Sequence, residues 1–208
     1  MVQTVAVGGV DLAQLAEKFG LKRSDAPDFF REWRDELPEL SEGEEGAVAE
    51  IKADYLYLSR YDLQKSVAKL VVLSPLLQLV GLYRPPFHFV VDEKIELETD
   101  DDGMTTALLH ILAMHPRLWL TIVEATYSKY SVAIAIPQTL SVMMEKAQPG
   151  EVVFGLVSNG QEFQFLKLLK TETPIYALSY TLCLNREDDL QRVAQILKAL
   201  SQWVTREV

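Results

Sequence analysis

The residues that could carry chemistry lie near the end of one apolar segment in the middle of the chain. Residues 118–126 read LWLTIVEAT, a pattern typical of a buried strand. Residues two apart on a strand point the same way, so Glu124 and Thr126 are expected to share a face. Metal-dependent hydrolysis of a phosphodiester uses such a strand end: a Glu two residues before a Lys sets a Mg²⁺ ligand beside an ammonium group, and an Asp on the neighbouring strand completes the site.

Three strands are expected to position this segment. Their ranges are 87–99, 105–114 and 118–125, separated by turns at 100–103 and 115–117. The second and third are almost continuously apolar, as in strands that are covered on both faces.

The chain after these strands predicts a helix over 134–147 and then a hairpin. Two apolar runs, 152–157 and 162–169, flank the two-residue turn signal Asn159-Gly160. A further strand is expected over 176–182, and a last helix begins near the acidic residues 187–189, which suit a helix N-terminus.

The first third of the chain predicts helices. A helix capped by Asp11 ends at Gly20, and a capping box at residues 41–44 starts another that reaches about Arg60. A helix is also expected over 25–36, where Phe29, Phe30 and Trp33 form an apolar stripe that is either core or a partner-binding surface. A fourth helix, over 62–82, is kinked or divided at Pro75.

The order of elements predicts an α/β fold with a mixed central sheet flanked by helices. A helical N-terminal region, 1–84, is expected to pack on an α/β core, 85–208, in one compact domain overall.

Composition narrows the classes of partner. The chain has 208 residues and a net charge of −10, which disfavours nucleic acid without excluding it. No run of 18 apolar residues and no secretion signal is present, and Cys183 is the single cysteine, so we expect a cytoplasmic protein with no membrane span.

Several segments together resemble one cyanobacterial family. They are VVLSPLLQLVGLYRPPFHF, RLWLTIVEA, IPQTL, VFGLVSNGQEFQFLKL and LNREDDLQRVAQILKAL. Members of that family are labelled restriction-endonuclease-like or type I restriction R-subunit-like. The resemblance covers essentially the whole chain and implies the fold of the PD-(D/E)xK nucleases.

The chain departs from the catalytic pattern that this resemblance implies. Aligned on RLW, the Asp position of the family falls on His110 and the Lys position on Thr126, whereas the Glu is kept as Glu124. The helix glutamine of the family matches Gln138. A neutral imidazole is a poor Mg²⁺ ligand, and Thr126 has no charge to stabilise a developing phosphorane.

Each of these residues also has a structural interpretation. Glu124 is either a metal ligand or a paired strand-end carboxylate. His110 could bind a softer metal such as Zn²⁺ or Mn²⁺ but is more often a hydrogen-bonded core residue. Lys129 could replace the missing lysine or be solvated, and Asp100–Asp102 could supply a carboxylate or form a solvated turn. Gln138 is a relic of the site helix or has no role.

The leading hypothesis is therefore a catalytically degenerate nuclease fold that acts as a protein-binding or scaffolding module, through a protein partner or self-association and without a cofactor. The rival is a Mg²⁺- or Mn²⁺-dependent DNA endonuclease whose site has migrated. In that case Glu124 holds the metal, with Asp100–Asp102 or Glu96 as a further ligand and Lys129 as the basic group. A third hypothesis is nucleic-acid binding without cleavage.

Overall fold

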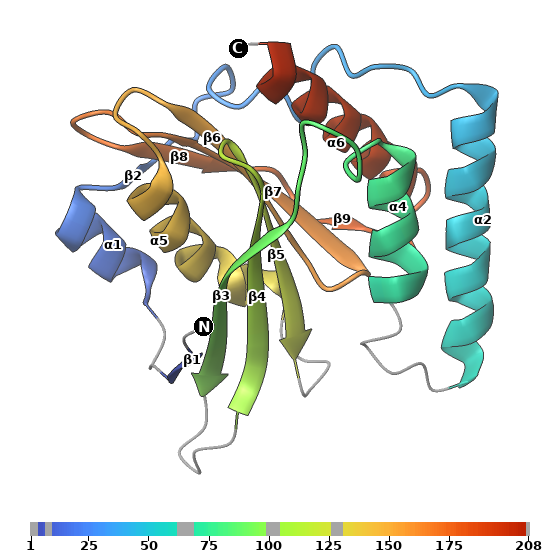
Figure 1. Cartoon of the computed structure of the whole chain (residues 1–208), viewed down its shortest axis with the longest axis horizontal. Coiled ribbons are helices and arrows are strands. Elements are labelled where there is room, and N and C mark those ends of the chain that lie inside the picture. Colours follow the sequence, from blue (N-terminus) through green and yellow to red (C-terminus); the bar gives the residue numbers. More distant parts are fainter. Residues whose placement is uncertain (1–3, 7–9, 62–68, 99–104, 126–130, 207–208) are drawn as a thin grey trace.

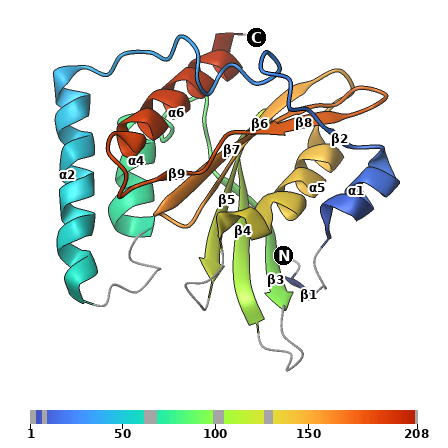
Figure 2. The ribbon, with the colours of Figure 1, turned by 180° about the vertical axis from the view of Figure 1, so that it is seen from behind.

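A mixed β-sheet forms the centre of the molecule and carries helices on both faces (Figures 1 and 2). This computed structural model describes residues 4–6, 10–61, 69–98, 105–125 and 131–206. The predicted fold class, α/β with a mixed central sheet flanked by helices, is confirmed.

Nine strands are found in the described ranges and belong to one sheet. The strands are β1 (Thr4–Ala6), β2 (Lys22–Arg23), β3 (Val90–Glu98), β4 (Thr105–His115), β5 (Leu118–Ala125), β6 (Val152–Ser158), β7 (Glu162–Leu169), β8 (Ile175–Leu178) and β9 (Leu182–Cys183). Their order is β1-β3-β4-β5-β6-β7-β8-β2, and β9 pairs with β7. The pairs β1–β3, β5–β6 and β8–β2 are parallel, and the others are antiparallel.

The helices divide between the two faces of the sheet. They are α1 (Leu12–Phe19), α2 (Glu42–Leu58), the 3₁₀ turn η1 (Ser59–Tyr61), the π-helical turn η2 (Lys69–Leu73), α4 (Ser74–Leu79), the 3₁₀ turn η3 (Val132–Ala135), α5 (Ile136–Lys146) and α6 (Asp189–Arg206). Buried residues of α1 and α5 form the core on one face, and those of α2, α4 and α6 form the core on the other. Of the helices in the described residues, none is both long and apolar enough to cross a membrane.

Local signals fixed the ends of the first two helices. The Asp11 carboxylate accepts a hydrogen bond from the Gln14 backbone N–H at 2.7 Å, and Gly20 ends α1 in the left-handed region with φ 67°. Ser41 and Glu44 form the predicted capping box, with the Ser41 N–H donating to the Glu44 carboxylate at 2.7 Å. Both helix starts are therefore confirmed.

The helix predicted over 25–36 is wrong, because this segment is a series of turns. It has to run from β2 at one edge of the sheet, past α6, to the start of α2 (Figure 1). A helix advances only about 1.5 Å per residue, whereas extended chain advances about 3.3 Å. Phe30 is still buried, and its ring lies 6.0 Å from that of Phe154, so the aromatic stripe was correctly predicted as core at this position.

Smaller differences concern the strands and the helix around Pro75. The strand predicted over 87–99 begins at Val90, and the one predicted over 176–182 is two short strands, β8 and β9. The helix expected over 62–82, kinked or divided at Pro75, is helical over consecutive residues from Lys69 to Leu79, with a change from a π-helical turn to α-helix at Ser74. Residues 62–68 lie outside the described residues.

The N-terminal region is less purely helical than predicted. It supplies β1, which pairs with β3, and β2, which pairs with β8, so both ends of the strand order come from the first 23 residues. A short added strand at each edge satisfies backbone groups that would otherwise be open to another chain. This region is thus part of the sheet and not only a helical layer packed on it.

Candidate functional site

The register between β4 and β5 brings two of the predicted site positions together. His110 pairs with Ile122, and Leu108 pairs with Glu124, so positions 110 and 124 are diagonal neighbours on the same face of the sheet. Diagonal positions on paired strands lie about 7–8 Å apart. Ile122 packs with the core that includes α6, which identifies the face.

The third strand of this layer adds further polar positions to the same face. Lys94 on β3 pairs with His110, and Glu96 pairs with Leu108. The sheet therefore holds two adjacent rows, Lys94–His110–Ile122 and Glu96–Leu108–Glu124. Glu96 was predicted only as one option among several. The register pairs both Glu96 and Glu124 with Leu108, so the two glutamate positions flank the same leucine in one row.

The side chains of these two rows whose burial is described are neither fully buried nor fully exposed. Leu108, His110 and Ile122 are all half-buried. The strands β3, β4 and β5 extend beyond the helices that cover the rest of the sheet (Figures 1 and 2).

Several predicted residues lie outside the described part of the chain or are described by their backbone alone. Asp100–Asp102, Thr126 and Lys129 lie outside the described residues, and positions 96 and 124 are described by their backbone register. Among the described side chains, no group of three His, Cys, Asp or Glu residues is close enough together to hold a metal ion.

Gln138 does not lie near positions 110 and 124. It lies on α5, which packs with Leu109 and Val123, the β4 and β5 residues of the opposite face. Only 5% of Gln138 is exposed, and its Nε2 donates to the Val10 carbonyl at 3.3 Å. The structure therefore separates Gln138 from positions 110 and 124 by the thickness of the sheet.

Sequence reasoning missed a surface groove between α2 and the η2–α4 segment. The groove has a volume of about 410 Å³ and is lined by Asp54, Tyr57, Leu58, Leu70, Val71, Ser74, Pro75 and Gln78. Leu70 is 71% exposed, Tyr57 55% and nearby Tyr61 67%. The rings of Tyr57 and Tyr61 meet edge to face at 5.5 Å. A signal was present in the sequence, because two tyrosines four residues apart share one side of a helix.

The apolar surface continues beyond the groove. The Tyr83 hydroxyl contacts the hydroxyl of Ser74, one of the groove residues, at 3.1 Å, and the Tyr83 ring lies 5.3 Å from that of Phe89. Tyr83 is 47% exposed and Phe89 37%. Exposed aromatic side chains therefore border the groove at Tyr57 and continue past Ser74 to Tyr83 and Phe89.

Comparison of the chain with protein-family models, with curated proteins and with solved structures finds no match. The likeness to restriction-endonuclease-like proteins therefore rests on the sequence segments given above.

Proposed function

We propose that this chain is a catalytically degenerate restriction-endonuclease-like protein that acts as a protein-binding or scaffolding module. The observation that carries the binding role is the groove between α2 and the η2–α4 segment, in which Tyr57 and Leu70 are exposed. Protein interfaces are enriched in tyrosine and in apolar groups at their centre, and such side chains become binding hot spots once water is excluded from them.

The charge of the chain suggests the chemistry of the surface that a partner would present. Asp54 lines the groove, and the net charge of the chain is −10. A partner that presents aliphatic side chains with a Lys or Arg at their rim would complement both features, because opposite potentials steer association and the apolar centre supplies affinity.

The loss of catalysis is supported by the occupants of the two rows. The position that the resemblance assigns to an Asp holds His110, next to Glu124 in the register. Hard cations such as Mg²⁺ bind imidazole poorly, and removing groups that act together lowers a rate by orders of magnitude.

Affinity capture with paired surface variants tests the binding role. We expect Tyr57→Ser combined with Leu70→Ser to lose a partner that the wild-type chain retains, since both side chains lie in the groove. Leu12→Ser is the matched control, because Leu12 is 37% exposed on α1, which packs with the other core. A partner lost equally from the control, or kept by the groove variant, would refute the assignment. Sedimentation velocity distinguishes self-association from a different partner.

One observation favours a second candidate, a Mn²⁺- or Mg²⁺-dependent endonuclease with a migrated site. Glu96 and Glu124 flank Leu108 in one row, and Lys94 stands in the next row. Two carboxylates suit a divalent metal ion, an imidazole would favour Mn²⁺ over Mg²⁺, and a lysine would offset phosphate charge. In this arrangement Lys94, rather than Lys129, would be the basic group.

Cleavage of supercoiled plasmid with Mg²⁺ or Mn²⁺ separates the two candidates. The degenerate protein is expected to leave the plasmid intact. Cleavage that disappears in Glu124→Gln but persists in Glu93→Gln would overturn the non-catalytic proposal, because Glu93 alternates with Lys94 and so belongs to the opposite face.

A restoration experiment tests the alignment itself. If His110 and Thr126 occupy former catalytic positions, the double variant His110→Asp, Thr126→Lys should bind Mn²⁺ measurably in calorimetry, whereas wild type should not. Absence of Mn²⁺ uptake by the double variant would mean that the alignment on RLW is wrong.

A further inference from the structure

A second pocket, separate from the groove, gathers three arginines. It has a volume of about 490 Å³ and lies where the segment between β2 and α2 crosses the start of α6. Its lining residues are Arg34, Leu37, Arg186, Glu187, Asp188, Asp189, Gln191, Arg192 and Gln195. This size is ordinary for a small-molecule site.

The Arg192 guanidinium is held by two aromatic rings. Its carbon lies 5.7 Å from the centre of the Trp33 ring and 5.8 Å from that of Tyr180. The two rings contact each other edge to face at 4.7 Å. The Arg192 Nε is buried and has no hydrogen-bond partner among the described residues. Stacking thus orients this guanidinium without satisfying all its donors.

Arg34, which lines the same pocket from the segment between β2 and α2, also has a buried Nε. This Nε makes no hydrogen bond in the described part of the chain, and it lies 3.6 Å from the Asp35 carboxylate, a long ion-pair contact. A buried donor without a hydrogen bond is costly, and this pocket has two: Arg192 Nε, and Arg34 Nε with only its long contact to Asp35.

The third arginine is already paired. Arg186 Nε lies 3.2 Å from the Asp189 carboxylate, which also accepts a hydrogen bond from the Cys183 backbone N–H at 2.8 Å. Glu187 and Asp188, the other two acids of the lining, are exposed at the start of α6. The negative charges of Glu187 and Asp188 would repel a polyanion. A ligand with one compact anionic group beside Arg34 and Arg192 would be repelled less.

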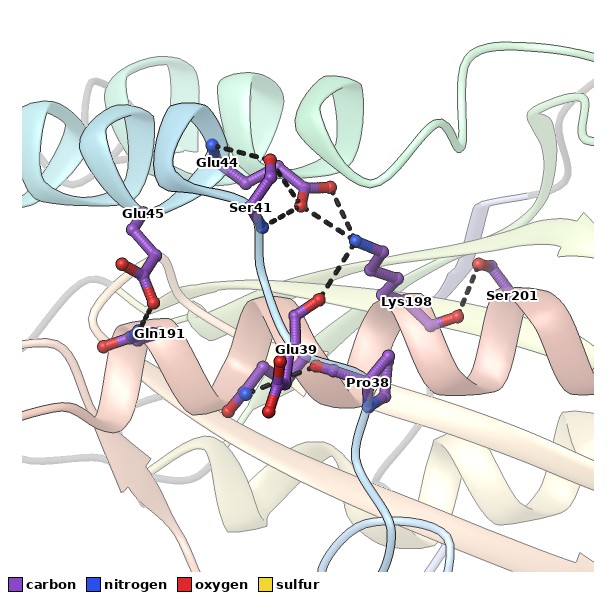
Figure 3. A network of polar contacts seen from close by, with 9 residues as sticks. Pro38, Glu39, Ser41, Glu44, Glu45, Gln191, Lys198 and Ser201 are labelled. Carbon is purple, nitrogen blue, oxygen red and sulfur yellow. Dashed lines mark hydrogen bonds and ion pairs between the residues drawn. The ribbon is translucent and has the colours of Figure 1, made fainter.

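Hydrogen bonds join the two elements that border the pocket. Figure 3 shows the polar network that ties the segment before α2, and the start of α2, to α6. Lys198 Nζ donates to both carboxylate oxygens of Glu44 at 2.8 Å, and Gln191 Nε2 donates to the Glu45 carboxylate at 3.0 Å. Gln195 Nε2 donates to the Pro38 carbonyl at 3.3 Å. A preformed pocket loses little entropy when it binds.

From this geometry we propose that the pocket binds a small oxyanion ligand through Arg34 and Arg192, which grip one carboxylate or phosphate group. Planar guanidinium groups match the oxygen spacing of both anions and bind them in pairs of charge-assisted hydrogen bonds. The positive end of the α6 dipole adds to the attraction. This site does not depend on the proposed partner groove.

Calorimetry with inorganic phosphate and with malonate, at constant ionic strength set by chloride, tests the site and shows which anion it prefers. We expect saturable binding of at least one probe, and an affinity at least 10-fold lower in Arg34→Gln and in Arg192→Gln. Arg206→Gln is the control: it removes the same charge from the far end of α6, where Arg206 contacts the Gln202 side chain. Equal weakening by the control, or no saturable binding of either probe, would overturn the proposal.

A measurement on the unaltered chain covers the case in which a variant fails to fold. In a titration followed by ¹H–¹⁵N correlation, the Trp33 indole signal should shift because its ring contacts Arg192. The Trp119 indole signal should not shift, because Trp119 is buried in the core of the opposite face. A Trp33 signal that stays fixed at saturating probe would contradict the site.

Discussion

A buried pair of hydroxyls joins the central strand β5 to the helix α5. We predict that removing one of these hydroxyls costs more stability than removing the other. The Oγ1 atoms of Thr121 and Thr139 lie 2.7 Å apart, and both residues are 0% exposed. Thr139 Oγ1 also lies 2.7 Å from the Ala135 carbonyl, to which it donates. Because a hydroxyl has one proton, Thr121 must be the donor to Thr139.

The cost of each deletion follows from this direction. Thr121→Val removes one hydrogen bond and leaves no buried donor without an acceptor, so it should lower the free energy of unfolding by about 1 kcal/mol. Thr139→Val removes the bond to Ala135 and leaves the buried Thr121 hydroxyl without an acceptor, so it should cost about 2–4 kcal/mol. Adding Thr121→Val to Thr139→Val removes the stranded donor and should restore about 1–2 kcal/mol.

Urea unfolding of the wild type, the two single variants and the double variant measures these values if the slope m is shared. Thr205→Val is a control for removing a helical Thr hydroxyl, since Thr205 Oγ1 donates to the Ser201 carbonyl at 3.0 Å from a half-buried position. The reasoning fails if Thr121→Val costs as much as Thr139→Val, or if the double variant is the least stable of the four.

Three further predictions concern pH and packing. Burial, with smaller contributions from neighbouring positive groups, lowers the pKa of His115 from its ordinary 6.5. The unfolded chain therefore takes up this proton at higher pH than the folded chain, and stability should fall as pH drops below 6.5. In denaturant midpoints measured between about pH 5 and 8, His115→Gln should remove this part of the fall. Hydrogen bonding to Lys198 lowers the pKa of Glu44 from 4.5, so Glu44→Gln should cost about 0.5–1 kcal/mol at pH 7, a difference that disappears as pH falls below 4.5. A Cβ on Gly155 would lie 3.1 Å from Met143 Sδ in the core, so Gly155→Ala should cost about 1–2 kcal/mol by thermal or urea unfolding.

Features with a local cause could be predicted from the sequence. The caps at Asp11 and Ser41 set helix starts because each cap bonds to N–H groups within three residues. The strand over 118–125 was predicted with its observed bounds, and the hairpin of β6 and β7 is found at Asn159-Gly160, although its loop is 159–161 and not the expected two residues. Positions 110 and 124 were expected to lie together, and the register of β4 on β5 makes them diagonal neighbours on one face, although this register contains an irregularity between Ala113 and His115 that the sequence did not show.

The candidate site was only partly predictable, because several of its relations are non-local. The sequence could not show that Glu96 would share a row with Glu124, since the register of β3 on β4 contains bulges. It also suggested that Gln138 belongs with Glu124, but a helix following a strand can cover either face, and α5 covers the other one.

The sequence by itself determined where most helices and strands begin and end, because caps, turns and alternating apolar residues act over a few neighbours. Only the tertiary structure decided which face each strand presents, how residues 25–36 run, and that Arg34 and Arg192 meet at one pocket. Those outcomes depend on packing between segments far apart in the chain, where burial of apolar surface outweighs local preference.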